Sequence, residues 1–555
     1  MQASSALARF GAVACALTLA AALAIGTAAS SAGATTWTST ATQAETLVNA
    51  TDLGPAAATT PMRVAVALKL QNQSALQRGI QNHVVLTPAQ FTSSYAPSAS
   101  QAQAVASYLT SNGFTNVRVA SNRLLVTAQG TAAQATAAFA TPIERFSQNG
   151  HEVFANTKAA RVPASIGNTV LAVLGLTTAA QMQVHPALAA TNPPSSCAVT
   201  HVGYPCTYNP QGFWQAYDAT SAPTGASTSV AIFAAGGVSQ VITDLRTEET
   251  ANGLAQVPAT IVPVGPAGTD TSGLDEWDMD TQYSTGMAGT VSHLHLYDTT
   301  SLSDSDITAE FNQFAADNIA KAGSASFGEC EFQASLDGSL QADDNAFMEA
   351  AAQGQTVFAS AGDTGGFCPV GAAVNGVPAG APDVNYPASS PWVIGAGGTT
   401  LVTNADGTYS NEVAWVAGGG GPSLFEAAPG YQTNVIPPLG TVCGTLGVAC
   451  GRAVPDVAMD ADPNSGANVY VSGQPEGVGG TSLSSPLSLG VWARLESASG
   501  NTLGFAGPLL YAAAGGPAFH DIVLGDTGPY PATPGYDFAT GNGTFDVAQA
   551  VAAIG

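Results

Sequence analysis

The sequence predicts an α/β protein in which a parallel sheet, covered by helices on both faces, follows a smaller α+β unit. The first observation is that apolar strands alternate with helical segments from about residue 207 onward. This alternation is typical of a parallel sheet whose functional residues lie in loops beyond the strand ends. The second observation is that residues from about 60 to 180 mix strand-like and helical runs in the order of a split βαβ, ferredoxin-like unit.

The smaller unit is expected to contain strands at 63–68 and 116–120 and helices at 100–109 and 130–139. In the larger unit, strands are expected at 230–234, 260–264, 294–297, 356–358 and 393–396. Two helices are expected between them, at 306–320 and 344–352. The chain has 61 glycines and 33 prolines, so long loops are expected as well.

Residues 1–32 have the pattern of a secretory signal peptide. Arg9 is followed by an apolar run over 10–25 and by small residues over 27–32. No other stretch is long and apolar enough to cross a bilayer. We therefore expect a secreted, extracellular protein that has no membrane contact once the leader is removed.

Six cysteines remain outside the leader, an even number that fits a disulfide-containing exported protein. Six cysteines allow fifteen pairings, and the sequence alone leaves them open. Two pairs are close enough in sequence for short disulfide loops, namely Cys197 with Cys206 and Cys443 with Cys450. The spacings contain no CxxC metal-binding signature.

The charge is unevenly distributed along the chain. Residues 1–199 contain nine basic and four acidic side chains, a net charge of +5. Residues 200–555 contain four basic and 34 acidic side chains, a net charge of −30, which together with +5 gives the total of −25. With so few cations to repel one another in acid, the larger unit is expected to tolerate low pH. Its negative charge argues against nucleic acid as a partner.

The segment Gly480-Thr481-Ser482-Leu483-Ser484-Ser485-Pro486, followed by an apolar run, predicts a turn from a strand into a helix. Such a turn can present the hydroxyl of Ser482 as a nucleophile, with helix N-terminal amides nearby. The alternative is an ordinary turn with a helix cap.

A serine nucleophile needs a base, and the seven histidines offer no good candidate. None of them stands in a His-Gly-Thr segment that could open a helix facing the serine. His293 and His295 alternate along a predicted strand, so both should point to one face as structural or surface residues.

Four carboxylates crowd into the segment 273–282 and offer a different base. Glu276 and Asp280 are four residues apart, so a helix would place them on one face, one turn apart. Two carboxylates held this close share a proton and can accept another from a serine in acid. The alternative is an acidic, solvated helix start that complements the helix dipole.

A third segment, 358–366, is an apolar strand that leads into a loop of small residues around Asp363. Asp363 has two interpretations. It can be a simple turn aspartate, or it can be protonated in acid and donate a hydrogen bond to a developing oxyanion.

These three segments, in this order, resemble the sedolisins, the serine-carboxyl peptidases of the kumamolisin and tripeptidyl-peptidase group. The shared motifs are Glu-x-x-x-Asp, Ser-x-Gly-Asp-x-Gly and Gly-Thr-Ser-x-Ser-x-Pro. The resemblance implies a subtilisin-like fold, with Ser482 as nucleophile and Glu276 as general base and acid. It further implies that Asp280 orients Glu276 and that Asp363 lies in the oxyanion hole. Trp277 resembles a tryptophan that supports the glutamate in some members, and the resemblance also implies a Cys330–Cys368 disulfide.

Segments 86–91 and 95–98 resemble the activation domain that precedes kumamolisin-type peptidases. The implied organisation is a signal peptide at 1–32, an activation prodomain at 33–181, a linker cut on maturation at 182–199 and a peptidase domain at 200–555. By the same resemblance the prodomain is an intramolecular chaperone and inhibitor. The chain departs from relatives at Phe327, where tryptophan is common, and at Ala234–Ala235, where some relatives have a glutamate near the base. These departures suggest a rebuilt proton network with a role for Glu329.

One structural calcium ion is a further implication of the resemblance. Sedolisins bind calcium in a loop like that at 520–543, and calcium prefers a mixture of carboxylates and main-chain carbonyls. The implied ligands are the side chains of Asp521 and Asp537 and the carbonyls of Ile522, Thr533 and Gly535. Taken without the resemblance, the two aspartates are turn residues.

The sequence thus predicts a monomeric, secreted, acid-active serine-type peptidase, made as a self-processing zymogen. It would hydrolyse protein or peptide substrates as an endopeptidase, with tripeptidyl-peptidase activity as an open variant. The alternative is a catalytically inactive secreted binding or adhesion protein on the same scaffold.

Overall fold

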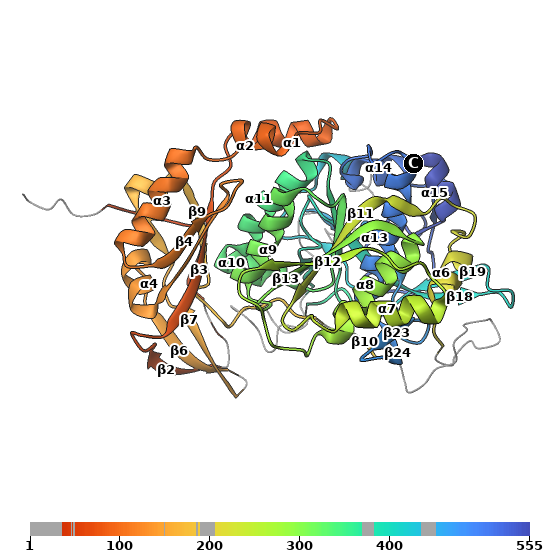
Figure 1. Cartoon of the computed structure of the whole chain (residues 1–555), viewed down its shortest axis with the longest axis horizontal. Helices are drawn as coiled ribbons and strands as arrows, with labels where there is room; N and C mark the ends of the chain where they lie inside the picture. Colours follow the sequence, from red (N-terminus) through yellow and green to blue (C-terminus); the bar gives the residue numbers. More distant parts are fainter. Residues whose placement is uncertain are drawn as a thin grey trace, which may run out of the picture. The chain divides into compact units, whose positions relative to one another are not determined.

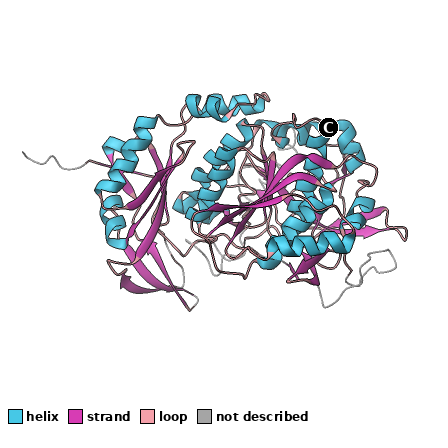
Figure 2. Cartoon of the chain, in the orientation of Figure 1, coloured by secondary structure: helices cyan, strands magenta, loops and turns pink. Residues whose placement is uncertain are grey.

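The computed structural model describes residues 36–45, 47, 50–148, 150–184, 187–188, 206–368, 382–433 and 451–555 (Figures 1 and 2). Apart from Thr36, these residues belong to one compact unit, Trp37–Gly555. The predicted signal peptide, most of the predicted linker, and Cys197, Cys443 and Cys450 lie outside the described residues.

The smaller domain, the predicted prodomain, is built on a four-stranded antiparallel sheet with the order β4-β5-β3-β9. The strands of this sheet are β3 (Pro61–Leu68), β4 (Thr115–Val119), β5 (Leu125–Thr131) and β9 (Val170–Leu174). Its two main helices are α3 (Ala99–Ser111) and α4 (Ala132–Phe139). The four elements expected in this unit are thereby confirmed.

Capping boxes explain where these two helices begin. The hydroxyls of Ser98 and Thr131 accept hydrogen bonds from the main-chain N–H of Gln101 and Gln134, whose side chains reach back to the cap. The helices pack on one face of the sheet through a core that includes Val66, among other buried residues. The remaining prodomain elements are β1 (Trp37–Ser39), β2 (Thr51–Pro55), α1 (Gln73–Gln81), α2 (Pro88–Ser94), β6 (Ile143–Gln148), β7 (His151–Asn156), β8 (Arg161–Pro163) and α5 (Ala164–Gly167).

The larger domain, the predicted peptidase domain, is built on a ten-stranded sheet with the order β12-β13-β11-β14-β16-β18-β22-β26-β25, in which β19 pairs with β18. Neighbouring strands from β12 to β26 are parallel. The two antiparallel pairs are β25 with β26 and β19 with β18. The first five strands are β12 (Ala259–Val264), β13 (Val291–Thr299), β11 (Gly225–Ala235), β14 (Ala322–Ala325) and β16 (Thr356–Ser360). The others are β18 (Ile394–Thr403), β19 (Tyr409–Ala414), β22 (Val457–Asp460), β25 (Phe519–His520) and β26 (Thr544–Phe545). The predicted parallel α/β architecture is confirmed.

Helices cover both faces of this sheet (Figure 2). On one face, α13 (Thr481–Ala498) crosses β11, β14, β16, β18 and β22 and packs against α8 (Leu274–Ala288). On the other face, α9 (Asp304–Asp317) and α11 (Ser339–Ala352) pack together and match the two helices expected there (Figure 1). The further helices are α6 (Pro210–Ala216), α7 (Val241–Asn252), α10 (Glu331–Asp337), α14 (Ala506–Ala513) and α15 (Val547–Ala553). No helix in the described part of the chain is long and apolar enough to span a bilayer.

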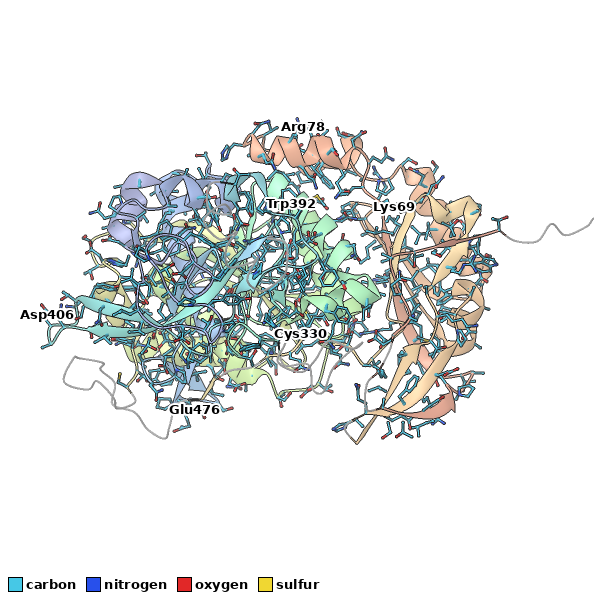
Figure 3. All side chains as sticks on the ribbon, turned by 180° about the vertical axis from the view of Figure 1, so that it is seen from behind. Lys69, Arg78, Cys330, Trp392, Asp406 and Glu476 are labelled. Carbon is cyan, nitrogen blue, oxygen red and sulfur yellow. A yellow bond between two sulfur atoms is a disulfide. The ribbon has the colours of Figure 1, made fainter. Side chains whose placement is uncertain are left out.

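The implied Cys330–Cys368 disulfide is confirmed. Figure 3 labels Cys330 in the body of the catalytic domain, where only 3 % of its surface is exposed. The same figure shows Asp406, in the turn between β18 and β19, and Glu476, on β24 (Gln474–Gly479), near the periphery. Cys206 is also disulfide-bonded.

Candidate active site

Helix α8 carries the two carboxyl groups that the sequence singles out. It begins after Gly273 and places Glu276 and Asp280 one turn apart, both fully buried. Trp277 anchors the first turn, because its indole N–H donates a 3.0 Å hydrogen bond to the carbonyl of Ala235 at the end of β11. The alternative, an acidic and solvated helix start, is therefore wrong, because this helix is buried along nearly its whole length.

Ser482 lies in the first turn of α13, directly after β24. Gly480 caps this helix with φ of 105°, a left-handed conformation that favours glycine and permits the sharp change of direction. The Ser482 hydroxyl donates to the main-chain carbonyl of Ser326 at 3.4 Å. The Ser482 N–H donates to no group in the described part of the chain, as is usual for a helix N-terminus.

Glu276 interacts electrostatically with each of the other candidate residues. Burial raises its pKa well above the ordinary value, and the neighbouring Asp280 and Asp363 raise it further, whereas the Ser482 hydroxyl lowers it. Among the described residues, neither oxygen of Glu276 has a hydrogen-bond partner within normal distance. The contact with Ser482 thus lacks the geometry of a formed hydrogen bond, as is common before substrate binds.

Asp363 lies in the loop after β16 and contacts the start of α13. Its Oδ1 accepts hydrogen bonds from the main-chain N–H of Thr481 at 2.8 Å and from the Thr481 hydroxyl at 2.7 Å. Its Oδ2 is buried and has no partner among the described residues. Burial raises the pKa of Asp363 to about 6, although the Thr481 hydrogen bonds oppose the rise. In acid this group therefore carries a proton that it can donate. The contribution of Thr481 was not foreseen from the sequence.

The part of the linker that is described passes close to this cluster. Gln183 pairs antiparallel with Gly328, through main-chain hydrogen bonds of 2.9 and 3.1 Å. Further along, β10 (Ala187–Leu188) pairs antiparallel with Gly479 and Val478 at the end of β24. Gly328 follows Ser326, and Gly479 precedes Ser482 by three residues. The linker is therefore hydrogen-bonded to two segments of the larger domain, one that follows Ser326 and one that leads into the helix of the candidate nucleophile.

The described histidines lie elsewhere. His293 and His295 stack with ring centroids 4.4 Å apart on one face of β13, as predicted, and His293 contacts the hydroxyl of Thr260. His520 stacks on Tyr409. Among the histidines that the structure describes, none forms a hydrogen bond with Ser482.

The structure places the departures from relatives as follows. Phe327 packs edge-on against Trp277, with centroids 6.1 Å apart. Burial raises the pKa of Glu329, and the carboxyl groups of Asp337, Glu45 and Asp343 raise it further, whereas the groups that act on Glu276 do not include Glu329. Behind Ala234 the carboxyl of Glu310, from α9, accepts the main-chain N–H of Ala234 at 3.2 Å. The suggested role of Glu329 in the proton network of Glu276 is therefore not supported.

In the loop expected to bind calcium, each of the two aspartates accepts a main-chain N–H from the segment 533–535. Asp521 accepts the N–H of Gly535 at 3.0 Å, and Asp537 accepts the N–H of Thr533 at 2.6 Å. The carbonyls of Ile522, Thr533 and Gly535 accept no hydrogen bond from the described residues. Two carboxylates and three unoccupied carbonyls form a donor set of oxygens, which fits calcium.

A second group with potential metal ligands is Cys330, Cys368 and Asp383. The two sulfur atoms are joined in the disulfide, so no thiolate is available to hold a metal.

The fold and these contacts define a class of protein, a subtilisin-like peptidase preceded by an activation domain. Residues 48–179 match the pro-kumamolisin activation domain, and residues 259–506 match the subtilase family. The chain is 39% identical over 518 residues to sedolisin from Pseudomonas sp. (strain 101), which covers 88% of this chain and 86% of that protein. It is 37% identical to xanthomonalisin from Xanthomonas sp. (strain T-22), over 88% of this chain and 65% of that protein.

A solved structure is similar as well. Pseudomonas sedolisin, described as a serine-carboxyl proteinase in complex with two molecules of pseudo-iodotyrostatin, matches with a TM-score of 0.57 and 39% identity. The match covers 63% of this chain and 98% of that chain. This protein belongs to the sedolisin family of serine-carboxyl peptidases, and the expected family is confirmed.

Proposed function

We propose that this protein is a secreted, acid-active endopeptidase in which Ser482 attacks the peptide carbonyl and Glu276 is the general base. The observation that carries this proposal is the buried cluster in which Glu276 interacts with Ser482, Asp280 and Asp363. A carboxyl group can serve as base in acid, where imidazole is protonated. Because burial raises the pKa of Glu276, the fraction of molecules with an ionised Glu276 falls as the pH drops, and this fall sets the acid limb of the activity profile.

In the proposed mechanism, Glu276 accepts the proton of the Ser482 hydroxyl as its oxygen bonds to the substrate carbonyl carbon. The negative charge that develops on the carbonyl oxygen is bound by protonated Asp363 and by the Ser482 N–H. Glu276 then gives its proton to the leaving amine, and the C–N bond breaks. Water attacks the acyl-enzyme by the same route, and Ser482 regains its proton. Asp280 shares a proton with Glu276 and orients it.

Asp363 provides a prediction about pH. Its protonated form donates to the oxyanion below about pH 6 and is lost as the pH rises through that value. Asp363→Asn keeps an acceptor for Thr481 and adds an N–H donor that does not titrate. We expect this variant to keep activity in acid and to lose the decline near pH 6. Asp363→Ala should lower kcat by roughly 10²–10³-fold, as removal of an oxyanion donor does elsewhere. Steady-state kcat from pH 3 to 8 tests both variants, and an unchanged decline in Asp363→Asn would contradict the assignment.

The prodomain is proposed to act as an intramolecular inhibitor, and the protein as a zymogen. Arg63 of the prodomain forms an ion pair with Asp306 of the catalytic domain and donates a 2.8 Å hydrogen bond to Thr300. Asn122 donates a 2.6 Å hydrogen bond to the buried carboxyl of Glu349. Together with the pairing of the linker with Gly328 and with β24, these contacts support a docked prodomain that blocks access to the nucleophile until the linker is cut.

Calcium is proposed as a structural ion, held by Asp521, Asp537 and the three carbonyls of the loop. A bound ion would fix this loop and would take no part in the reaction. In a Ser482→Ala background, which prevents self-cleavage, we expect calcium in excess to raise the melting temperature. At 100 times the dissociation constant, the gain is about 2.7 kcal/mol. Asp521→Ala should lose this gain, whereas Asp526→Ala, a nearby exposed aspartate, should keep it. Equal melting temperatures for Ser482→Ala in calcium and in chelator would contradict the site.

The second candidate function is a catalytically inactive secreted binding protein. It shares the scaffold but gives no reason for the buried contacts among Glu276, Asp363 and Ser482. The experiment that tests the proposal is cleavage of a denatured protein substrate by the processed protein at about pH 3–4. Cleavage at internal peptide bonds of the substrate supports an endopeptidase. Stepwise release of tripeptides from the substrate N-terminus supports a tripeptidyl-peptidase. An uncleaved substrate and an unprocessed chain would favour the binding protein.

A further inference from the structure

Ser326 contacts both helices that carry the proposed catalytic residues, α8 and α13, although the proposed mechanism does not use it. It lies directly after β14, in the centre of the sheet, and only 1 % of its surface is exposed. Its hydroxyl lies 2.6 Å from Oδ1 of Asp280 on α8 and 3.1 Å from the carbonyl oxygen of Ser482 on α13. Its own carbonyl accepts the hydroxyl of Ser482.

The carbonyl of Ser482 is available to Ser326 because of a proline. In an α-helix the N–H of residue 486 would bond to the carbonyl of residue 482, but Pro486 has no N–H. A buried carbonyl left without a donor is costly, so a hydroxyl nearby stabilises it. A serine hydroxyl has one hydrogen and can also accept. It can therefore donate to ionised Asp280, or accept from protonated Asp280 while it donates to Ser482.

Ser326 is also the group that holds Asp280. Within the described part of the chain, the Asp280 carboxyl forms one hydrogen bond, to Ser326, and its Oδ2 has no partner. Two further charged groups act on Glu276 of this pair, namely Asp363, on the loop after β16, and Asp275, on the same helix. Both are acidic, so among the described groups that act on this pair no cation substitutes for the Ser326 hydroxyl in favouring an ionised Asp280.

We propose that Ser326 is a positioning residue for the reaction: its hydroxyl fixes Asp280, and through Asp280 the base Glu276, against Ser482. This inference rests on the proposed function of Glu276 and Ser482. When the hydroxyl donates to Asp280, it selects the side-chain orientation of Asp280 and favours its ionised form. When Asp280 is protonated and donates to the hydroxyl, the hydroxyl donates to the Ser482 carbonyl and supports the backbone that carries the nucleophile.

Ser326→Ala removes the hydroxyl and nothing else of the contact. Burial raises the pKa of Asp280 and the Ser326 hydrogen bond opposes the rise, so the variant should raise this pKa further. A hydrogen bond to a charged group is worth enough for a shift of about one pH unit. We expect the acid limb of the kcat profile to move up by about one unit. At pH values on the acid side of this limb, the kcat of the variant should be about tenfold lower than that of the wild type, with little change in KM.

Ser324→Ala is the matched control. Ser324 lies two residues earlier on the same face of β14, and its hydroxyl is 2.7 Å from that of Ser485 on the same helix, α13. It is fully buried, and within the described structure its hydroxyl forms no hydrogen bond with a carboxyl group. We expect a loss of stability comparable to that of Ser326→Ala and an unchanged pH profile. Ser326→Thr keeps the hydroxyl and should restore the acid limb.

The outcomes separate this inference from the proposed function. If Ser482→Ala is inactive and Ser326→Ala has the wild-type acid limb, the positioning role is wrong and the peptidase mechanism stands. If Ser482→Ala remains active, the proposed mechanism fails first. If Ser326→Ala does not fold, Ser326→Cys preserves the volume with a weaker donor. Its acid limb should lie between those of wild type and the predicted alanine variant, and a wild-type limb in Ser326→Cys would overturn the proposal.

Discussion

Ser482→Ala is expected to abolish peptidase activity, with kcat lower by roughly 10⁶-fold, the size of the loss when a serine nucleophile is removed elsewhere. The reason is that no other hydroxyl occupies this place between the Ser326 carbonyl and the Glu276 carboxyl. The variant should also accumulate as the unprocessed full-length chain at about pH 3–4, because its linker can no longer be cut from within. Turnover of a peptide substrate and the mass of the purified protein measure the two effects.

Ser488→Ala is the control for this change. Ser488 is a fully buried serine on the same helix, and its hydroxyl has no hydrogen-bond partner among the described residues. Its replacement should leave both self-processing and turnover at wild-type levels. Processing of Ser482→Ala at the wild-type rate, in the absence of any other peptidase, would remove Ser482 from the mechanism.

Glu276→Gln is expected to lower kcat by at least about 10⁴-fold, because the amide keeps the shape of the side chain but cannot accept the serine proton. The fold should be retained, since Glu276 forms no hydrogen bond within the described structure that the amide would lose. Asp278→Asn, two residues away, is the matched control. Asp278 is also buried, and burial followed by the charge of Asp244 raises its pKa to about 9, but it interacts with Asp244 rather than with Ser482.

Circular dichroism and kcat, measured for both variants at the same acid pH, distinguish loss of the base from loss of the fold. An active Glu276→Gln, or an Asp278→Asn that is equally impaired, would contradict the assignment of Glu276.

Local patterns predicted much of this structure. The spacing of Glu276 and Asp280 depends only on helix geometry, so their stacking on one face could be derived before any tertiary contact was known. The stacking of His293 on His295 follows in the same way from the alternation of a strand. The strands of the large sheet were found because buried parallel strands appear as apolar runs between helical segments.

What could not be predicted depends on contacts between residues far apart in the sequence. Ser326 reaches Asp280 across 46 positions, and Asp363 reaches Thr481 across 118 positions. Glu329 is close in sequence to Ser326, but its carboxyl faces Asp337 and Glu45 instead of the base. The acidic start of α8 was open to a solvated interpretation because sequence does not show that α13 packs over it.

The pH dependence of kcat/KM for the processed enzyme, from pH 2 to 8, tests most directly whether a carboxyl group accepts the serine proton. The account predicts activity at pH 3–4 that declines near pH 6, where Asp363 loses its proton. An imidazole base would behave in the opposite way, because its ordinary pKa is about 6.5 and it is inactive when protonated. Activity that is absent at pH 4 and rises through pH 6–7 to a neutral plateau would contradict the central claim.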